Sequence, residues 1–160
     1  DVITHNALLS AFEKGAQWEV ALRARALMLG DRVCPDVISH SAVISACEKG
    51  HQWESALACF AGLPRERMQP NVILYSAAVS ACEKGHQWQR ALTLLSEMQA
   101  ERLQPDVIVI NAVISACEKG CRRGLAISLL MGMESRRLQP DVVSFNAAIS
   151  ACEKGAKWEM

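Results

Sequence analysis

Small hydrogen-bonding side chains recur at two sites of this sequence, each 35 residues after the last. The first site holds Asn6, Ser41, Ser76, Asn111 and Asn146, and the second holds Asp36, Asn71, Asp106 and Asp141. An amide, hydroxyl or carboxylate in a mostly apolar stretch needs a hydrogen-bond partner. Local capping of a helix would supply one. Alternatively, the two sites line a shared surface and offer donors and acceptors to a ligand with the same repeat.

The sequence contains no recognisable catalytic motif. Glu13 and its equivalents (Glu48, Glu83, Glu118 and Glu153) occur once per 35 residues, so no two form a catalytic pair within one block. Histidine is not retained at equivalent positions of the blocks, because the position of His5 and His40 holds Tyr75, Ile110 and Phe145 in the other blocks. Neither a Ser-His-Asp constellation nor a glycine-rich phosphate or dinucleotide loop is present. We therefore expect no catalytic residue and no enzyme activity.

Most of the seven cysteines belong to the repeat. Cys47, Cys82, Cys117 and Cys152 occupy one equivalent position, which holds Phe12 in the first block. A position that accepts either cysteine or phenylalanine is typical of a buried apolar site. Equivalent residues of stacked repeats lie on the order of 10 Å apart, too far for a disulfide. Cys117 and Cys121 have no second ligand pair, so we expect no metal and no cofactor.

Internal repetition organises the whole chain. The segment Ser-Ala-Cys-Glu-Lys-Gly ends at Gly50, Gly85, Gly120 and Gly155, and a fifth copy with Phe12 ends at Gly15. A fixed period of this length is typical of a solenoid. We expect four full blocks, residues 1–35, 36–70, 71–105 and 106–140, and a partial fifth, residues 141–160. Both ends look like cuts through a longer array.

Charge and hydropathy restrict the partners. Seventeen basic residues balance seventeen acidic ones, whereas phosphate contacts usually bring a basic excess. A solenoid can still place its few cations on one concave face. The longest nearly apolar run, Val107 to Cys117, is too short to span a bilayer. We expect a monomeric array without a membrane segment.

Each block is predicted to fold as two helices of about a dozen residues, divided at the central glycine. The first helix has a competing interpretation, because Val107 to Ile114 is rich in β-branched residues and resembles a buried strand. The following Ala-Cys-Glu-Lys and the glycine favour a helix, and we expect that glycine to take the left-handed cap. The Asp or Asn that opens each block, or a nearby Thr4, Ser39 or Ser144, can cap its start. Prolines end the preceding block at positions 35, 70, 105 and 140.

The second helix carries one apolar stripe. In block three Trp88, Ala91, Leu92, Leu95 and Met98 recur at helical spacing. One Trp per block at a helix start could stack on a base, but it is more typical of a packing anchor. Pro64 is expected to end the second helix of block two early. Arg123 and Gly124 are expected to weaken the first turn in block four.

The sequence resembles the pentatricopeptide repeats over its whole length. The evidence is the 35-residue period, the motif Asp-Val-Ile-Ser-His-Ser-Ala-Val-Ile-Ser-Ala-Cys-Glu-Lys-Gly, then Trp-Glu-Ser-Ala-Leu and the closing Gln-Pro-Asp/Asn. The related tetratricopeptide pattern has a 34-residue period. Full blocks of 35 residues resemble the plain, uninterrupted (P-class) repeats of the family. The resemblance implies an all-α, right-handed α-solenoid that binds single-stranded RNA, with one base per repeat.

The resemblance also implies roles for individual residues. Base-reading residues would be Asn6 with Asp36 for uracil, Ser41 with Asn71 for adenine, Ser76 with Asp106 for guanine, and Asn111 with Asp141 for uracil, while Asn146 has no partner in the sequence. The implied tract is 5′-UAGU-3′. Base-flanking residues would be Ile3, Ile38, Ile73, Ile108 and Val143, and phosphate-contacting residues would be Lys14, Lys49, Lys84, Lys119 and Lys154.

The same resemblance implies a role in organellar RNA processing, stability, editing or translation, in a chloroplast or mitochondrion. The main alternative is a protein-interaction scaffold of tetratricopeptide type, which would bind protein partners in the same groove. A third interpretation is a decayed or purely structural repeat, suggested by the near-identity of the blocks and by Gly124.

Overall fold

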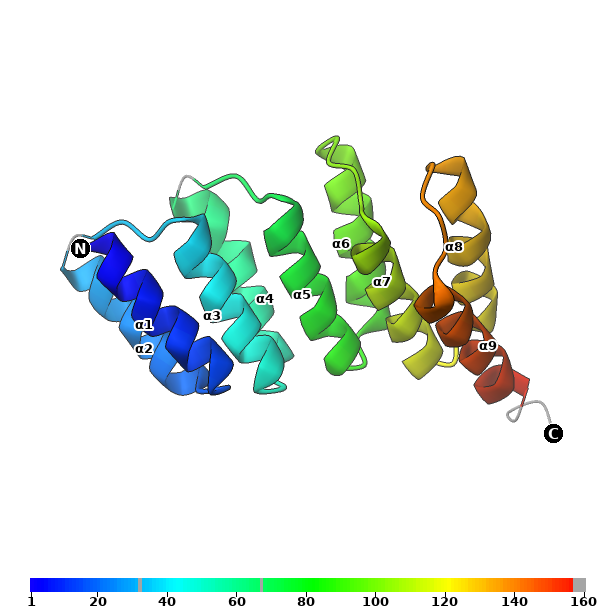
Figure 1. Cartoon of the computed structure of the whole chain (residues 1–160), viewed down its shortest axis with the longest axis horizontal. Coiled ribbons are helices and arrows are strands. Elements are labelled where there is room, and N and C mark those ends of the chain that lie inside the picture. The colour runs from blue at the N-terminus through cyan, green and yellow to red at the C-terminus, as the bar shows by residue number, and fades with distance from the viewer. Residues whose placement is uncertain (32, 67, 157–160) are drawn as a thin grey trace. The chain divides into compact units, whose positions relative to one another are not determined.

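The computed structural model describes residues 1–31, 33–66 and 68–156, and the regular structure in these residues is helical throughout (Figure 1). The first helices of the blocks are α1 (Val2–Lys14), α3 (Val37–Lys49), α5 (Val72–Lys84), α7 (Val107–Lys119) and α9 (Val142–Ala156). The second helices are α2 (Trp18–Gly30), α4 (Trp53–Gly62), α6 (Trp88–Ala100) and α8 (Arg123–Ser135), with a short 3₁₀ helix, η1 (Leu63–Glu66), after α4. None of these helices is both long and apolar enough to cross a membrane.

The chain forms two compact units, Asp1–Ala81 and Cys82–Met160. Within the first unit, α1 packs against α2 and α3, and α3 also packs against α2 and α4. Figure 1 shows α1 and α3 side by side. Within the second unit, α7 packs against α6, α8 and α9. Each unit therefore contains a first helix, α3 or α7, with helices around it.

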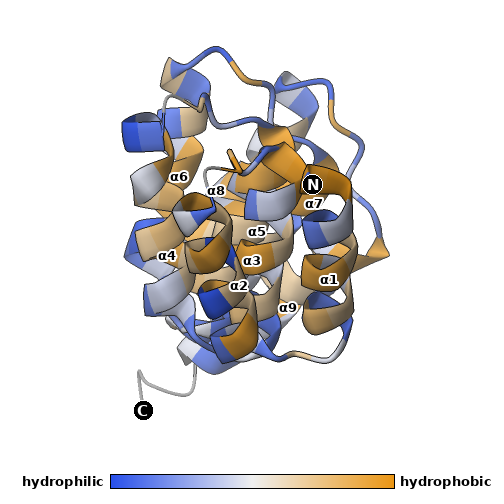
Figure 2. Ribbon diagram, turned by 90° about the vertical axis from the view of Figure 1, so that its left-hand side faces the viewer, coloured by the Kyte–Doolittle hydropathy of each residue, from blue (hydrophilic) through white to orange (hydrophobic). Residues whose placement is uncertain are grey.

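The burial of α3 and α7 over more than half of their circumference explains why most of their residues are apolar. Buried positions in α7 include Val109, Ile110, Val113, Ile114, Ala116 and Cys117, whereas Ile108 on the remaining side is 65% exposed. The β-branched run therefore forms a helix, as predicted, and not a strand. Figure 2 shows apolar residues along both helices of the first pair, α1 and α2.

A side-chain cap starts each first helix. The carboxylates of Asp1, Asp36, Asp106 and Asp141 and the amide oxygen of Asn71 each accept a hydrogen bond from the backbone N–H three residues later. Such a bond satisfies one of the free N–H groups of a helix start. The predicted caps are confirmed, and the second helices start without a side-chain cap bond in α2, α4, α6 and α8.

The prediction for the end of the first helices was wrong by one residue. Gly50 has φ −79°, and His51 after it takes the left-handed conformation with φ 57°. The bonds from His51 N to Glu48 O (3.0 Å) and from Gln52 N to Cys47 O (2.8 Å) form a Schellman motif around His51. Ala16 and Cys121 repeat this geometry with φ 51° and 54°.

Gly50 and Gly120 are needed for packing and not for their backbone freedom. A Cβ atom on Gly50 would lie 2.4 Å from Cδ1 of Trp18, and one on Gly120 would lie 2.3 Å from Cδ1 of Trp88. The Trp of one block thus lies against the glycine of the next. This confirms the interpretation of the Trp as a packing anchor.

The second helix of block two departs from the others, as Pro64 predicts. α4 ends at Gly62, and the chain continues as η1 through Leu63–Glu66. Glu66 then pairs with Arg25 of α2 and lies 3.2 Å from the buried His40 of α3. In block four, α8 still begins at Arg123, the position of Trp in the other blocks.

Candidate functional site

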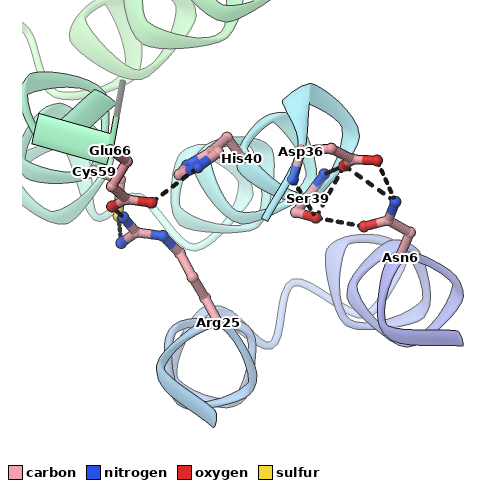
Figure 3. Close-up of polar contacts among 7 residues, drawn as sticks. All are labelled: Asn6, Arg25, Asp36, Ser39, His40, Cys59 and Glu66. Carbon is pink, nitrogen blue, oxygen red and sulfur yellow. Dashed lines mark hydrogen bonds and ion pairs between the residues drawn. The ribbon is translucent and has the colours of Figure 1, made fainter. Parts of the chain in front are cut away.

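The structure brings together the first predicted pair of base-reading residues. Asn6 on α1 and Asp36 at the start of α3 face each other (Figure 3). The Asn6 Nδ2 group donates to both carboxylate oxygens of Asp36, at 3.1 Å and 3.0 Å. Because a carboxylate only accepts, the group that faces it must be the NH₂ of the amide.

The second unit repeats this arrangement independently. Asn111 on α7 donates from Nδ2 to Oδ1 of Asp141, which precedes α9, at 3.0 Å. Asn111 is buried apart from 9% of its surface, so this amide has little freedom to turn. Both Asn–Asp pairs that the family resemblance implies are therefore in direct contact.

A serine completes each pair, and this role was not predicted. Ser39 donates from Oγ to Oδ1 of Asn6 at 2.5 Å, and Ser144 donates to Oδ1 of Asn111 at 2.6 Å. The sequence alone predicts both serines only as helix caps. A signal was present in the spacing, because each serine follows its asparagine by the same interval of 33 residues.

The remaining predicted readers are arranged differently. Ser41 and Asn71 share no hydrogen bond among the described residues of the first unit, and Asn71 uses its amide oxygen to cap α5. Ser76 belongs to the first unit and Asp106 to the second, and their pairing stays a prediction. Asn146 is exposed on α9.

Two of the reader carboxylates, Asp36 and Asp141, favour the ionised form. Burial alone would raise the pKa of Asp36, but the hydrogen bonds from Ser39 and Asn6 outweigh it, and the pKa lies below the usual value. The backbone and hydroxyl hydrogen bonds of Ser144 lower the pKa of Asp141 in the same way. An ionised carboxylate can then accept from the Asn amide at neutral pH.

Aliphatic side chains stand exposed beside the readers. The predicted base-flanking residues Ile3, Ile38, Ile73, Ile108 and Val143 are between 56% and 78% exposed. Ile3 precedes Asn6 by three residues, and Ile108 precedes Asn111 by the same step, so each pair shares one side of its helix. In such an arrangement the aliphatic side chain can pack on the flat face of a planar ring, while the neighbouring amide forms hydrogen bonds with the edge of the same ring.

The predicted phosphate-contacting lysines already have partners in three blocks. Lys49, Lys119 and Lys154 pair with Glu13, Glu83 and Glu118 of the preceding block, at 2.8, 2.7 and 2.7 Å. Ser45 and Ser150 also donate to Glu13 and Glu118. Burial would raise the pKa of Glu118, but the bonds from Lys154 and Ser150 lower it overall. Lys14 is exposed and Lys84 is partly buried.

The repeated cysteines are packing residues where they are buried. Burial raises the pKa of Cys47 to about 12 and that of Cys117 to about 11, so both are protonated at neutral pH. Cys152 is only partly buried. In the part of the chain that the structure describes, no three His, Cys, Asp or Glu residues lie close enough together to hold a metal ion.

Solved structures share this fold at low sequence identity. The PPR domain of Arabidopsis thaliana protein-only RNase P 1, solved in complex with tRNA, matches with TM-score 0.82 and 13% identity over 98% of this chain and 86% of that one. The pentatricopeptide repeat protein PPR10, solved with an 18-nt psaJ RNA element, matches with TM-score 0.84 and 22% identity over 98% of this chain and 23% of that one. A structure of the pentatricopeptide repeat protein PPR10 from maize matches with TM-score 0.74 and 24% identity over 93% of this chain and 21% of that one.

These likenesses confirm the all-α solenoid class, and the chain spans about a quarter of the length of PPR10. No curated protein matches the chain in sequence. A family model described as "Pentatricopeptide repeat domain" matches residues 1–50, 60–120 and 93–154, which together are most of the chain. The chain therefore belongs to the pentatricopeptide repeat family.

Proposed function

We propose that this chain binds single-stranded RNA and reads one base per repeat. The observation that carries the proposal is the contact between Asn6 and Asp36 and its copy between Asn111 and Asp141, each beside an exposed aliphatic residue. Base edges offer donors and acceptors, and an aliphatic side chain can cover a base face. The repeats themselves bind and do not catalyse.

Each Asn amide keeps hydrogen-bonding capacity for a ligand. Of the two Nδ2 protons of Asn6, one is shared between the Asp36 oxygens, and the other remains. Of the two lone pairs on Oδ1, one accepts from Ser39. One donor and one acceptor are therefore left to meet a base edge.

The proposed tract is 5′-UAGU-3′, with the N-terminus of the chain toward the RNA 5′ end. The family resemblance supplies the base assignment of the four reader pairs, and the five-block division belongs to the same proposal. Each block from 1–35 to 106–140 then binds one base, and Asn146 is the first reader of block 141–160. The lysines beside the central glycines would contact phosphate.

Two of the similar structures support RNA as the ligand, because they were solved with RNA: PPR10 with an 18-nt element and the RNase P 1 domain with tRNA. With this function we propose the setting that the family resemblance implies, which is RNA processing, stability, editing or translation in a chloroplast or mitochondrion.

Fluorescence anisotropy at low salt tests the proposal with short labelled RNAs that carry UAGU in an otherwise uniform single-stranded context. The controls are UGAU RNA and UAGU as DNA. The exchange variant Asn71→Asp with Asp106→Asn keeps an N-cap residue at both positions. We expect the wild type to prefer UAGU and the exchange variant to prefer UGAU.

Binding of the two RNAs with equal affinity by the wild type, in this chain and in a longer array that contains it, would contradict base reading. A chain that ignores RNA altogether but captures peptides would instead be a scaffold of tetratricopeptide type.

A further inference from the structure

The side-chain amide of asparagine can fit a base edge in two orientations, related by a half turn that exchanges its donor and its acceptor. Uracil presents an N–H donor at N3 and a carbonyl acceptor at O4, whereas cytosine presents an acceptor at N3 and an amino donor at N4. An amide that turns freely therefore serves both pyrimidines. Selection of uracil requires that the amide be held in one orientation. The inference below rests on the proposed RNA reading.

The hydrogen-bond ring around Asn6 leaves one orientation. Asp36 can only accept, so it holds the Nδ2 side of the amide. Ser39 lies on the other side, with its Oγ at 2.5 Å from Oδ1 of Asn6 (Figure 3). A half turn of the amide would place its oxygen against the carboxylate and its NH₂ against the hydroxyl.

The contacts of Ser39 indicate which atom accepts its hydroxyl proton. The backbone N–H of Asp36 donates to Ser39 Oγ at 3.2 Å, which leaves the hydroxyl to act as the donor on its other side. Its oxygen is nearer to Asn6 Oδ1 at 2.5 Å than to Asp36 Oδ1 at 3.0 Å. The Asp36 oxygen is also supplied by the Ser39 backbone N–H at 2.8 Å. The proton therefore goes to the asparagine.

The second unit shows the same ring at a separate site. Ser144 Oγ is 2.6 Å from Oδ1 of Asn111 and 2.9 Å from Oδ1 of Asp141, and it accepts from the Asp141 backbone N–H at 3.1 Å. Ser39 and Ser144 both have 0% exposure. A buried hydroxyl cannot meet an RNA base, so each serine can act only through its asparagine.

The other two reader pairs lack this serine. For the pair of Ser41 with Asn71, the residue equivalent to Ser39 is Leu74. For the pair of Ser76 with Asp106, it is Val109. A serine reader carries one rotating hydroxyl and has no two-sided amide to orient. The hydroxyl at this position is thus present where the reader is asparagine and absent where the reader is serine.

We propose that Ser39 and Ser144 are positioning residues that make the first and fourth repeats select uracil over cytosine, by fixing the orientation of the Asn6 and Asn111 amides. They form a third determinant of base choice, beside the two readers of each pair.

The test compares the affinities for UAGU, CAGU and UAGC in the same single-stranded context. Ser39→Ala is expected to reduce the preference for uracil over cytosine at the first base about five-fold, the worth of one hydrogen bond, and to leave the fourth base unchanged. Ser144→Ala is expected to show the converse. Ser39→Thr keeps the hydroxyl and should restore the wild-type preference.

Thr4→Ala is the matched control for the loss of a helix cap. At the equivalent place of α1 the Thr4 hydroxyl bonds Asp1 at 2.8 Å, and among the described residues it bonds no asparagine. This variant should lose similar stability and keep both base preferences. In the free protein, the side-chain amide NMR signals of Asn6 should move in Ser39→Ala and stay in place in Thr4→Ala.

Base preferences that stay the same in Ser39→Ala and Ser144→Ala, in a protein that still prefers UAGU over UGAU, would overturn the inference and leave the proposed function standing. A wild type that binds UAGU and CAGU with equal affinity would also overturn the inference and leave the proposed function standing. A wild type that binds none of the RNAs would reject both.

Discussion

His40 is fully buried in the first unit, and its ring faces the carboxylate of Glu66. Nε2 is 3.2 Å from the nearer oxygen of Glu66, which in turn pairs with Arg25 (Figure 3). Among the described residues, neither ring nitrogen has a well-aligned hydrogen bond. Burial, followed by the charge of Arg25, lowers the pKa of His40 against the opposing effects of Glu66 and Asp36. Folding therefore favours the neutral ring.

We expect the stability of this protein to fall as the pH drops below 6.5, the ordinary pKa of histidine, because the unfolded chain then binds a proton that the folded His40 resists. The substitution His40→Phe introduces the residue type that the fifth block has at the equivalent position, Phe145. It should remove the contribution of His40 to the slope of the unfolding free energy against pH. It should also raise the free energy of unfolding at pH 6 by on the order of 1 kcal/mol, since no polar ring stays unpaired. Urea unfolding at pH 5.5, 6.5 and 7.5 measures both effects. An unchanged slope in the variant would show that His40 is not the responsible group.

The reader contacts show what a sequence can and cannot predict at the residue scale. Asn6 and Asp36 were predicted as a pair through the family resemblance, whereas their direct bond needs the packing of α1 beside α3. Ser39 was predicted only as a cap, because helix-start signals are local and its bond to Asn6 joins two different blocks. The cluster of His40, Glu66 and Arg25 was also missed, since it depends on where the chain turns after Pro64.

At the scale of the helices, local chemistry predicted the fold well. An Asp or Asn after a proline marks the start of a helix, and Lys-Gly marks its end, so the helical ranges follow from neighbouring residues. The left-handed residue could not be placed in this way. The left-handed conformation falls on the residue after the glycine at Ala16, His51 and Cys121, whether or not a Trp ring lies against that glycine.

Gly50→Ala is expected to lower the stability of the chain by roughly 1–3 kcal/mol, because its Cβ would lie 2.4 Å from the Trp18 ring and the packing must shift. Gly15→Ala is the matched control. Gly15 has almost the same backbone angles, and a Cβ there would meet its nearest atom, in Gln17, at an ordinary 3.5 Å. Thermal unfolding of the two variants tests the difference, and equal destabilisation would contradict the packing explanation.

Over the whole molecule the charges balance in total, and ion pairs between blocks provide part of this balance. Seventeen basic and seventeen acidic residues give a net charge of zero, and glutamates of one block pair with lysines of the next. Under the proposed function, an RNA phosphate would compete with these carboxylates for the same ammonium groups. The family resemblance alone could not predict this competition, because the pairing joins residues 36 positions apart.

Replacing Glu13, Glu83 and Glu118 together by glutamine should therefore strengthen RNA binding and steepen its salt dependence. Three released lysines that each meet a phosphate would add about 2 to the slope of log K against log salt. The control variant carries Glu19→Gln, Glu54→Gln and Glu97→Gln, which make the same change in net charge at exposed positions of the second helices. Anisotropy titrations from 50 to 200 mM salt, about the range in which such slopes are measured, compare the two. An equal gain in both variants would point to net charge alone.

The residue that opens each block has two roles, and this limits which residue types can replace it. The side chain at positions 36, 71, 106 and 141 starts the next helix and also belongs to a proposed reader pair. Only the few residue types that cap a helix can occupy it without loss of stability. An exchange of Asp for Asn stays within this small set of residue types, so under the proposed base reading a single exchange would change the preferred RNA at one repeat and keep the fold.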